Sequence, residues 1–217
     1  MAADPLVAAI TAGDVEAVRA LVREDPARAS ARDGHGLPVV LLALFHQQRP
    51  VADALLEVEP ELGVLEAAAT GRAETLAELL AADPAAIRQR TPEGFTPLGL
   101  AAFLGGPEVV RVLLERGADA DDDPDNPFGV RPVHAAGAAH DHETMRLLLE
   151  AGADPNLRQR GGFVPLHEAA HSDDAEMARL LLAHGADPAI AADDGRDSLR
   201  IAADDGSSAV ASLLARR

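Results

Sequence analysis

The segment 167–171 reads His-Glu-Ala-Ala-His, a spacing of two histidines and a glutamate that could do metal chemistry. On a helix, residues four apart lie on one face, so His167 and His171 could hold Zn²⁺ while Glu168 acts as general base on a metal-bound water. The sequence defines no third ligand, because His184 would lie at the far end of the following helix. The segment keeps a zinc-dependent hydrolase open as an alternative function.

An acidic run offers a second kind of metal chemistry, because five carboxylates lie within residues 119–125. Aspartates at alternate positions are typical of loops that hold a hard cation such as Ca²⁺ through oxygen ligands. However, Asn126 stands where such a loop needs its glycine, and Pro132 stands where it needs a bidentate glutamate. We therefore expect a solvated acidic loop, with cation binding as the alternative.

The remaining polar side chains form no catalytic pattern. Residues 140–143 read His-Asp-His-Glu, and we expect them to make a hydrophilic turn between two helices that titrates near neutrality. The chain has no cysteine, no G-x-S-x-G nucleophile turn, no P-loop and no G-x-G-x-x-G at a strand-to-helix junction. We accordingly expect no enzyme, no cofactor and no resident metal.

Composition and charge indicate what kind of partner and cellular location to expect. The 217 residues carry 19 basic and 36 acidic side chains, a net charge of -17, and every basic residue is arginine. Such a field repels phosphate backbones and anionic lipids, so we expect neither nucleic acid nor membrane as a partner. No apolar run reaches the length of a membrane span, which favours a cytoplasmic protein. The alanine- and arginine-rich composition without lysine favours a bacterial source with a high-GC genome.

The elements that must position these residues come from an internal repeat. The segment Thr96–Ala102 recurs at Arg131–Gly137 and at Val164–Ala170. Its central apolar residue recurs at offsets of 35, 33 and 33 residues. Those residues are Leu98, Val133, Leu166 and Leu199. The first three copies are each followed by a leucine pair and then Gly-Ala-Asp, and weaker copies flank them, which brings the count to seven.

This pattern resembles the ankyrin repeat, with T-P-L-H-x-A-A, a leucine pair and G-A-D at a period near 33 residues. The resemblance covers essentially the whole chain and implies an all-α solenoid of helix-turn-helix units joined by hairpin-like fingers. It also implies that His134 and His167 brace neighbouring backbone loops. We expect a single array over residues 1–217. Its approximate repeats are 1–33, 34–60, 61–90, 91–124, 125–157, 158–190 and 191–217.

Within one repeat, proline suits the first turn of a helix and glycine suits the residue after its end. This predicts a first helix over Pro97–Leu104 and a second over Glu108–Arg116. The ends of the array should be polar, because a repeat buries its apolar face only against its neighbours. The spacing from Leu56 to Val64 is too short for a finger, so we expect a notch near residues 57–64 that is either a place for a partner to cross or a neutral deletion.

The resemblance also locates a candidate binding face, since fingers and first helices line the concave side of such arrays. Three of the five phenylalanines fall in fingers, and Phe103 falls near the end of a first helix, where it could equally pack between helices. Aromatic anchors dominate interface energetics, and arginine forks suit carboxylates at a rim. The candidate partner-binding residues are Phe95, Leu100, Phe103, Leu104, Phe128, Arg131, Phe163, His171, Arg196 and Arg200.

These residues favour a non-enzymatic scaffold that holds a partner protein in its concave face. We expect the chain to be monomeric alone, although an exposed phenylalanine patch could also self-associate. A regulatory partner of a neighbouring gene product is a further alternative that the residues do not separate from general scaffolding. The family spans many unrelated partners, so the fold does not name one.

Overall fold

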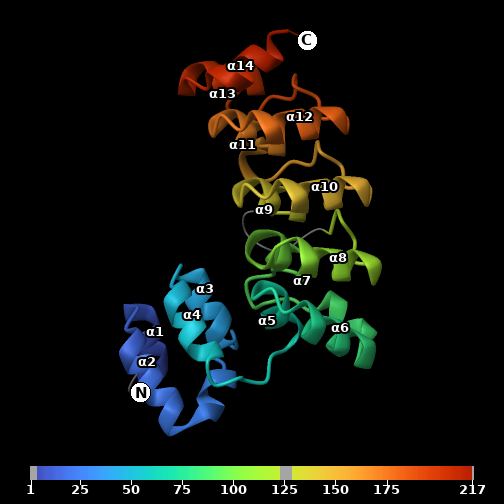
Figure 1. Cartoon of the computed structure of the whole chain (residues 1–217). Helices are drawn as coiled ribbons and strands as arrows, with labels where there is room; N and C mark the ends of the chain where they lie inside the picture. Colours follow the sequence, from blue (N-terminus) through green and yellow to red (C-terminus); the bar gives the residue numbers. More distant parts are fainter. Residues whose placement is uncertain (1–3, 123–128, 217) are drawn as a thin grey trace. The chain divides into compact units, whose positions relative to one another are not determined.

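The computed structural model describes residues 4–122 and 129–216, and in these ranges the chain is helical with no β-sheet (Figure 1). Two isolated β-bridges are the extended pairings found there. The all-α class expected from the repeat is thus confirmed. The α-helices are α1 (Pro5–Ala12), α2 (Val15–Glu24), α3 (Val39–Phe45), α4 (Arg49–Leu56), α5 (Val64–Ala69), α6 (Ala73–Ala82), α7 (Pro97–Leu100), α8 (Pro107–Glu115), α9 (Pro132–Ala138), α10 (His142–Glu150), α11 (Pro165–His171), α12 (Ala175–Ala183), α13 (Ser198–Asp205) and α14 (Ser208–Leu214).

Four short turns of other helical types complete the described elements. Three are 3-10 turns, and the fourth is a π-helical turn that extends α7. They are η1 (Pro26–Ser30), η2 (Pro84–Arg88), η3 (Ala101–Gly105) and η4 (Arg160–Gly162). Together α7 and η3 span residues 97–105, and α8 spans 107–115, so the helix pair expected there is present within one residue at each end.

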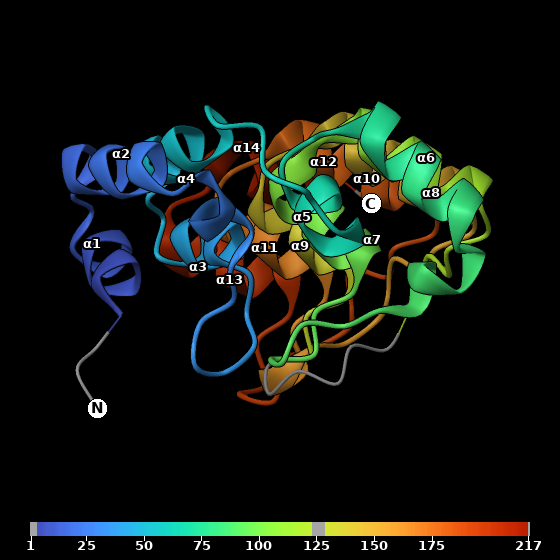
Figure 2. The same ribbon diagram turned by 90° about the horizontal axis from the view of Figure 1, so that it is seen from below.

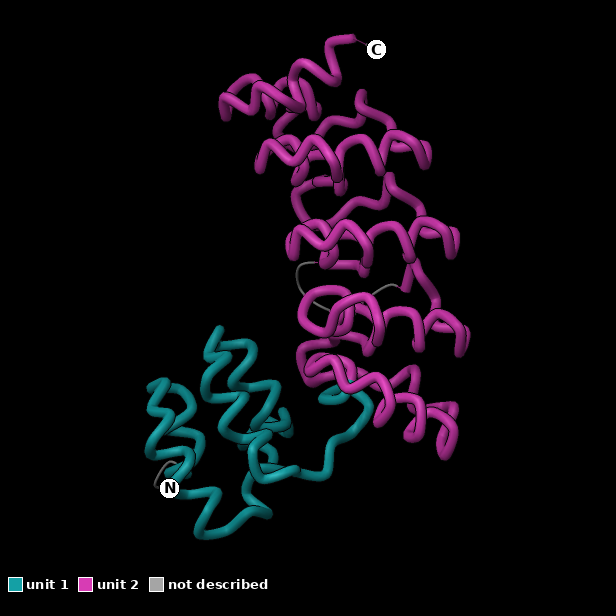
Figure 3. The backbone as a smooth tube through the Cα atoms, viewed as in Figure 1, with its two compact units in different colours: residues 1–67 teal, residues 68–217 magenta. Residues whose placement is uncertain are grey.

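The chain divides into two compact units, residues 1–67 and 68–217, with the division inside α5 (Figure 3). In the first unit, α1 packs against α3 and α2 against α4. Its core is formed by fully buried side chains of these helices. They are Ile10, Val18, Val51 and Leu55, with Leu41 of α3.

The second unit stacks its helices in two layers. In the inner layer, α7 with η3, α9, α11 and α13 pack in succession, and in the outer layer α6, α8, α10, α12 and α14 do the same. The loops before α7, α11 and α13 project from the same side of this stack (Figure 2). Fully buried leucines from both layers fill the space between successive pairs, so each pair depends on its neighbours.

Local sequence explains where these helices begin. Proline occupies the first position of α7, α9 and α11, where a backbone N–H would find no acceptor within the helix. Thr96 caps α7 by accepting a hydrogen bond from the N–H of Gly99 at 3.1 Å. Asp141 and Asp174 cap the outer helices α10 and α12 in the same way.

The fingers end in a tight turn that recurs along the chain. In the finger before α7, the N–H of Gly94 donates to the carbonyl of Thr91, and the N–H of Thr91 donates to the carbonyl of Phe95. Gly94 has a φ of 87°, a conformation that favours glycine. The same two hydrogen bonds form at Asp33–Leu37, Gln159–Phe163 and Ala192–Arg196.

No such turn forms between α4 and α5, which are joined directly by residues 57–63. As the short spacing predicts, this linker forms no finger. The notch that the spacing also predicts, and any use of it by a partner, stay predictions. Among the described residues, no helix combines the length and the apolar character that crossing a membrane requires.

Candidate functional site

The inner helices of the second unit present equivalent residues side by side at their C-terminal ends. Counting from the first helical position of each repeat, Phe103, Ala138, His171 and Asp204 occupy the same place. All four are exposed, and the helices or turn that carry them pack in succession. The face they form changes from aromatic at Phe103, through a small side chain, to ionisable groups at the α13 end. We call these four residues the inner row.

Phe103 is the most exposed large apolar side chain of the described residues, with 51% of its surface accessible. Phe95 and Phe163 are half-buried, although the sequence favours their exposure. The backbone carbonyl of each closes the tight turn of its finger. The ring of Phe163 meets the imidazole of His167 edge-on, with centroids 5.7 Å apart. Phe128 lies outside the described residues.

Leu100 is buried, which corrects the prediction of a partner-binding residue made from its place on the inner helix. Only 2% of Leu100 is exposed, so it offers a partner almost no surface. Leu104, next to Phe103, is half-buried and can contribute part of its surface. Phe103 is therefore the principal exposed apolar side chain of this region.

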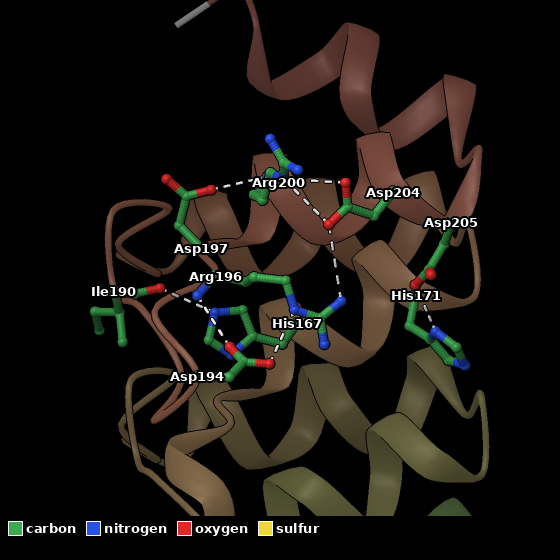
Figure 4. Close-up of polar contacts among 9 residues, drawn as sticks. All are labelled: His167, His171, Ile190, Asp194, Arg196, Asp197, Arg200, Asp204 and Asp205. Carbon is green, nitrogen blue, oxygen red and sulfur yellow. Dashed lines mark hydrogen bonds and ion pairs between the residues drawn. The ribbon is translucent and has the colours of Figure 1, made fainter.

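The three predicted rim arginines already have partners within the chain. Arg131 donates to the backbone carbonyl of Asp121 at 2.6 Å. Arg196 pairs with Asp194 at 2.9 Å, and Arg200 pairs with Asp204 at 3.0 Å (Figure 4). Arg196 and Arg200 are thus paired with carboxylates of their own repeat, whereas the partner of Arg131 is a backbone carbonyl of the preceding finger.

The contact between Arg196 and Asp194 in the last finger also lowers the pKa of the Asp194 carboxylate. The backbone N–H and then the guanidinium of Arg196 lower the pKa of Asp194 below its ordinary value. The Asp194 carboxylate therefore stays ionised and keeps its arginine engaged near neutral pH.

The His-Glu-Ala-Ala-His segment lies on α11, but its two histidines serve different contacts. His167 is 1% exposed, and its Nδ1 accepts a hydrogen bond from the N–H of Val164 at 3.1 Å. Its Nε2 therefore carries the proton and donates to the carbonyl of Ile190 at 2.9 Å, in the next finger (Figure 4). Burial lowers the pKa of His167, so the ring is neutral.

His171 is turned toward the following helix instead. Its Nδ1 donates to Asp205 of α13 at 2.7 Å, and this hydrogen bond raises the pKa of the imidazole. Both nitrogens of His167 are occupied by backbone, so the two rings are not available together for zinc. Over the described ranges, no three His, Asp or Glu side chains gather in a way that suits a metal ion. The geometry thus offers no support for the hydrolase alternative.

His134 makes the equivalent contact one repeat earlier, as the resemblance implies. It is buried, and its Nε2 lies 3.3 Å from the carbonyl of Phe163 in the next finger. Burial lowers the pKa of His134 to about 4. These two histidines join α9 and α11 to the backbone of the finger that follows each helix, and so hold successive repeats in register.

The polar turn at residues 140–143 also connects repeats, which sequence reasoning missed. His142 Nε2 donates to Asp174 at 2.8 Å, and His140 Nδ1 lies 3.5 Å from the same carboxylate. Burial opposes ionisation of Asp174, but the N–H of Met177 and the His142 imidazole lower its pKa overall. The signal was present in the sequence, since Asp174 occupies the helix-capping position one repeat after Asp141.

The described part of the acidic run is used for contacts between fingers. Asp122 pairs with Arg90 at 3.0 Å, and Asp121 accepts a hydrogen bond from the N–H of Asp154 at 2.9 Å. The rest of the run, residues 123–125, lies outside the described residues. The cation site considered for this loop therefore stays an untested alternative.

Glu168 is a further residue that sequence reasoning did not identify as a possible partner-binding group. It occupies the position held by Leu100, Ala135 and Ile201 in the other inner helices, all of which are buried. Glu168 is half-buried, and its carboxylate has no hydrogen bond or ion pair among the described residues. Aligning the repeats reveals it, because a carboxylate replaces an apolar side chain at this position.

Comparison with known proteins agrees with this repeat architecture. A family model for ankyrin repeats, spanning three copies, matches residues 64–159 and 133–217. An ankyrin repeat domain-containing protein of the fungus Stachybotrys chartarum, SAT10, is 32% identical over 162 residues, which cover 72% of this chain and 8% of that protein. The chain therefore spans under a tenth of that relative's length. With its paired helices, its finger turns and these matches, the chain belongs to the ankyrin-repeat family.

Proposed function

We propose that the chain is a non-enzymatic scaffold that binds a partner protein through the inner helices and fingers of its second unit. Ankyrin repeats generally mediate protein–protein interaction, and the partner, the face and the absence of catalysis in this chain belong to the proposal. One observation carries the choice of face: Phe103 is 51% exposed in the inner row, so a large part of an aromatic ring faces solvent there.

The arrangement around Phe103 fits an interface anchor. Leu104 beside it is half-buried, and Ala138 of the next helix is small and exposed, so a partner side chain can approach the ring from that side. The ionisable groups farther along the inner row would lie at the polar rim of such an interface.

The experiment is affinity capture from lysate of the source organism with wild-type chain and two variants. Phe103→Ala removes the proposed anchor, whereas Leu199→Ala removes the other exposed large apolar side chain, which is 40% exposed on α13. A protein retained by the wild type and by Leu199→Ala, but lost with Phe103→Ala, supports the proposal. Equal retention by all three forms contradicts this choice of face, once circular dichroism shows that all three are equally folded.

A further inference from the structure

Glu168 and Phe103 are two groups on the same face of the inner layer that the fold itself does not use. They lie on α11 and on η3, with α9 between them in the packed layer. Between them Ala138 of α9 is exposed, and Gly137 beside it is buried. A Cβ at position 137 would lie 4.0 Å from Cγ of Glu168 and 3.9 Å from Cε of Met145, so the stem of the Glu168 side chain lies beside this glycine.

Among the described residues no cation forms an ion pair with Glu168, although its charge contributes to raising the pKa of His171. His171 lies one turn later on α11 and is engaged by Asp205. Arg196 and Arg200, on the neighbouring finger and helix, are paired with their own aspartates. Arg158 of the preceding finger pairs with Asp193 at 3.2 Å. Arg160 stands exposed at that finger's tip, where it has no partner among the described residues.

The residue types on this face suggest an acidic partner, but the pairing of the arginines favours a basic one. Arginine forks on a rim favour an acidic partner, but here Arg196 and Arg200 are occupied by aspartates of their own repeat, and Arg158 is occupied by an aspartate of the next finger. The segment 187–205 illustrates the balance, with six aspartates and two arginines. The whole chain has a net charge of -17, so we expect a negative electrostatic potential at this face.

We propose that the inner-helix face of the second unit binds an extended, basic segment of the partner protein, placing an apolar side chain on Phe103 and a lysine or arginine on Glu168. This inference rests on the proposed function and adds the chemistry of the partner. Neighbouring helices pack about 8–10 Å apart, so two steps from η3 to α11 span roughly 20 Å. An extended chain covers about 3.3 Å per residue, which places the two partner side chains about six residues apart.

The pairing at Glu168 is worth more than a surface ion pair. The carboxylate is half-buried in a position that is apolar in the other repeats, so a partner cation would shield it further from water. Charge-assisted hydrogen bonds in such settings are roughly twice as strong as neutral ones. Removing the charge of Glu168 should therefore weaken binding about ten-fold.

The test is selection of peptides from a random twelve-residue display library against the folded full chain, followed by affinity measurement on variants. We expect enrichment of peptides that carry a lysine or arginine about six residues from a large apolar side chain. Glu168→Gln keeps the shape and removes the charge, and should weaken these peptides about ten-fold. Glu150→Gln makes the same change on the exposed end of α10, and should alter binding less than two-fold.

The outcomes separate this inference from the proposed function. Peptides that depend on Phe103 but bind Glu168→Gln and Glu150→Gln equally overturn the basic-segment inference and leave the binding face intact. Enrichment of acidic peptides, or no enrichment, also overturns the inference. Peptides that depend on neither Phe103 nor Glu168 contradict both proposals.

Discussion

Replacing His167 by alanine tests whether the buried histidines hold successive repeats together. The imidazole bridges the N–H of Val164 and the carbonyl of Ile190, and its ring packs against Phe163. Alanine removes both hydrogen bonds at once and opens a small cavity between α11 and the finger before α13. The change is confined to one boundary between repeats.

The expected loss follows from the burial of the two groups. A buried polar group that loses its partner costs about 1–3 kcal/mol. Val164 is fully buried, whereas Ile190 is half-exposed and its carbonyl can reach water, so we take a total of about 3 kcal/mol. For a chain of this size, each kcal/mol lowers Tm by about 2–4 °C, which gives a decrease of about 6–12 °C.

Thermal unfolding followed by circular dichroism at pH 7.5 measures this decrease. The matched control is His171→Ala, which removes an exposed imidazole and its ion pair with Asp205 from the same helix. Exposed ion pairs contribute at most about 1 kcal/mol, so the control should lower Tm by under about 4 °C. Equal decreases for His167→Ala and His171→Ala would refute the bridging role of the buried ring.

Two further predictions concern other parts of the second unit. Because the pKa of His134 is lowered to about 4, the unfolded chain binds a proton near pH 6.5 before the folded chain does. The free energy of unfolding should therefore fall as pH decreases from about 6.5 to 4, and His134→Gln, which cannot titrate, should show a smaller fall in urea unfolding. Gly105→Ala should destabilise by about 1–3 kcal/mol, because its Cβ would lie 2.0 Å from the carbonyl oxygen of Ala68. Gly137→Ala on α9 meets nothing closer than 3.9 Å and should be neutral or stabilising by up to about 1 kcal/mol, as urea unfolding can show. Destabilisation by both glycine substitutions would contradict the steric argument.

Helix boundaries could be predicted because they depend on neighbouring residues in the chain. The helix start at Pro97 and the finger glycine at position 94 are recognisable without knowledge of the fold. Repetition of these signals at a nearly constant period adds the expectation that each pair packs against the next. The missing finger at residues 57–63 follows from chain length alone, since no hairpin fits into seven residues that already link two helices.

The candidate site could be predicted only in part, because exposure depends on how a side chain meets the adjacent repeat. Phe103 and Leu100 are three residues apart on one helix, yet the first is exposed and the second is buried. The availability of Arg196 and Arg200 depends on the aspartates that reach them in the folded last repeat. Residue type identified these positions as candidates without showing which of them remain free.

By itself, the sequence determined the all-α class and the helix pairs, because these follow from local propensity and from a repeated period, and the resemblance of the repeat to a known family implied the histidines that brace the fingers. The tertiary structure alone decided that both nitrogens of His167 are occupied by backbone groups and that Phe103 is exposed whereas Leu100 is buried. Each of these facts depends on atoms supplied by a neighbouring helix or finger, and their distance and direction are set only when the helices stack.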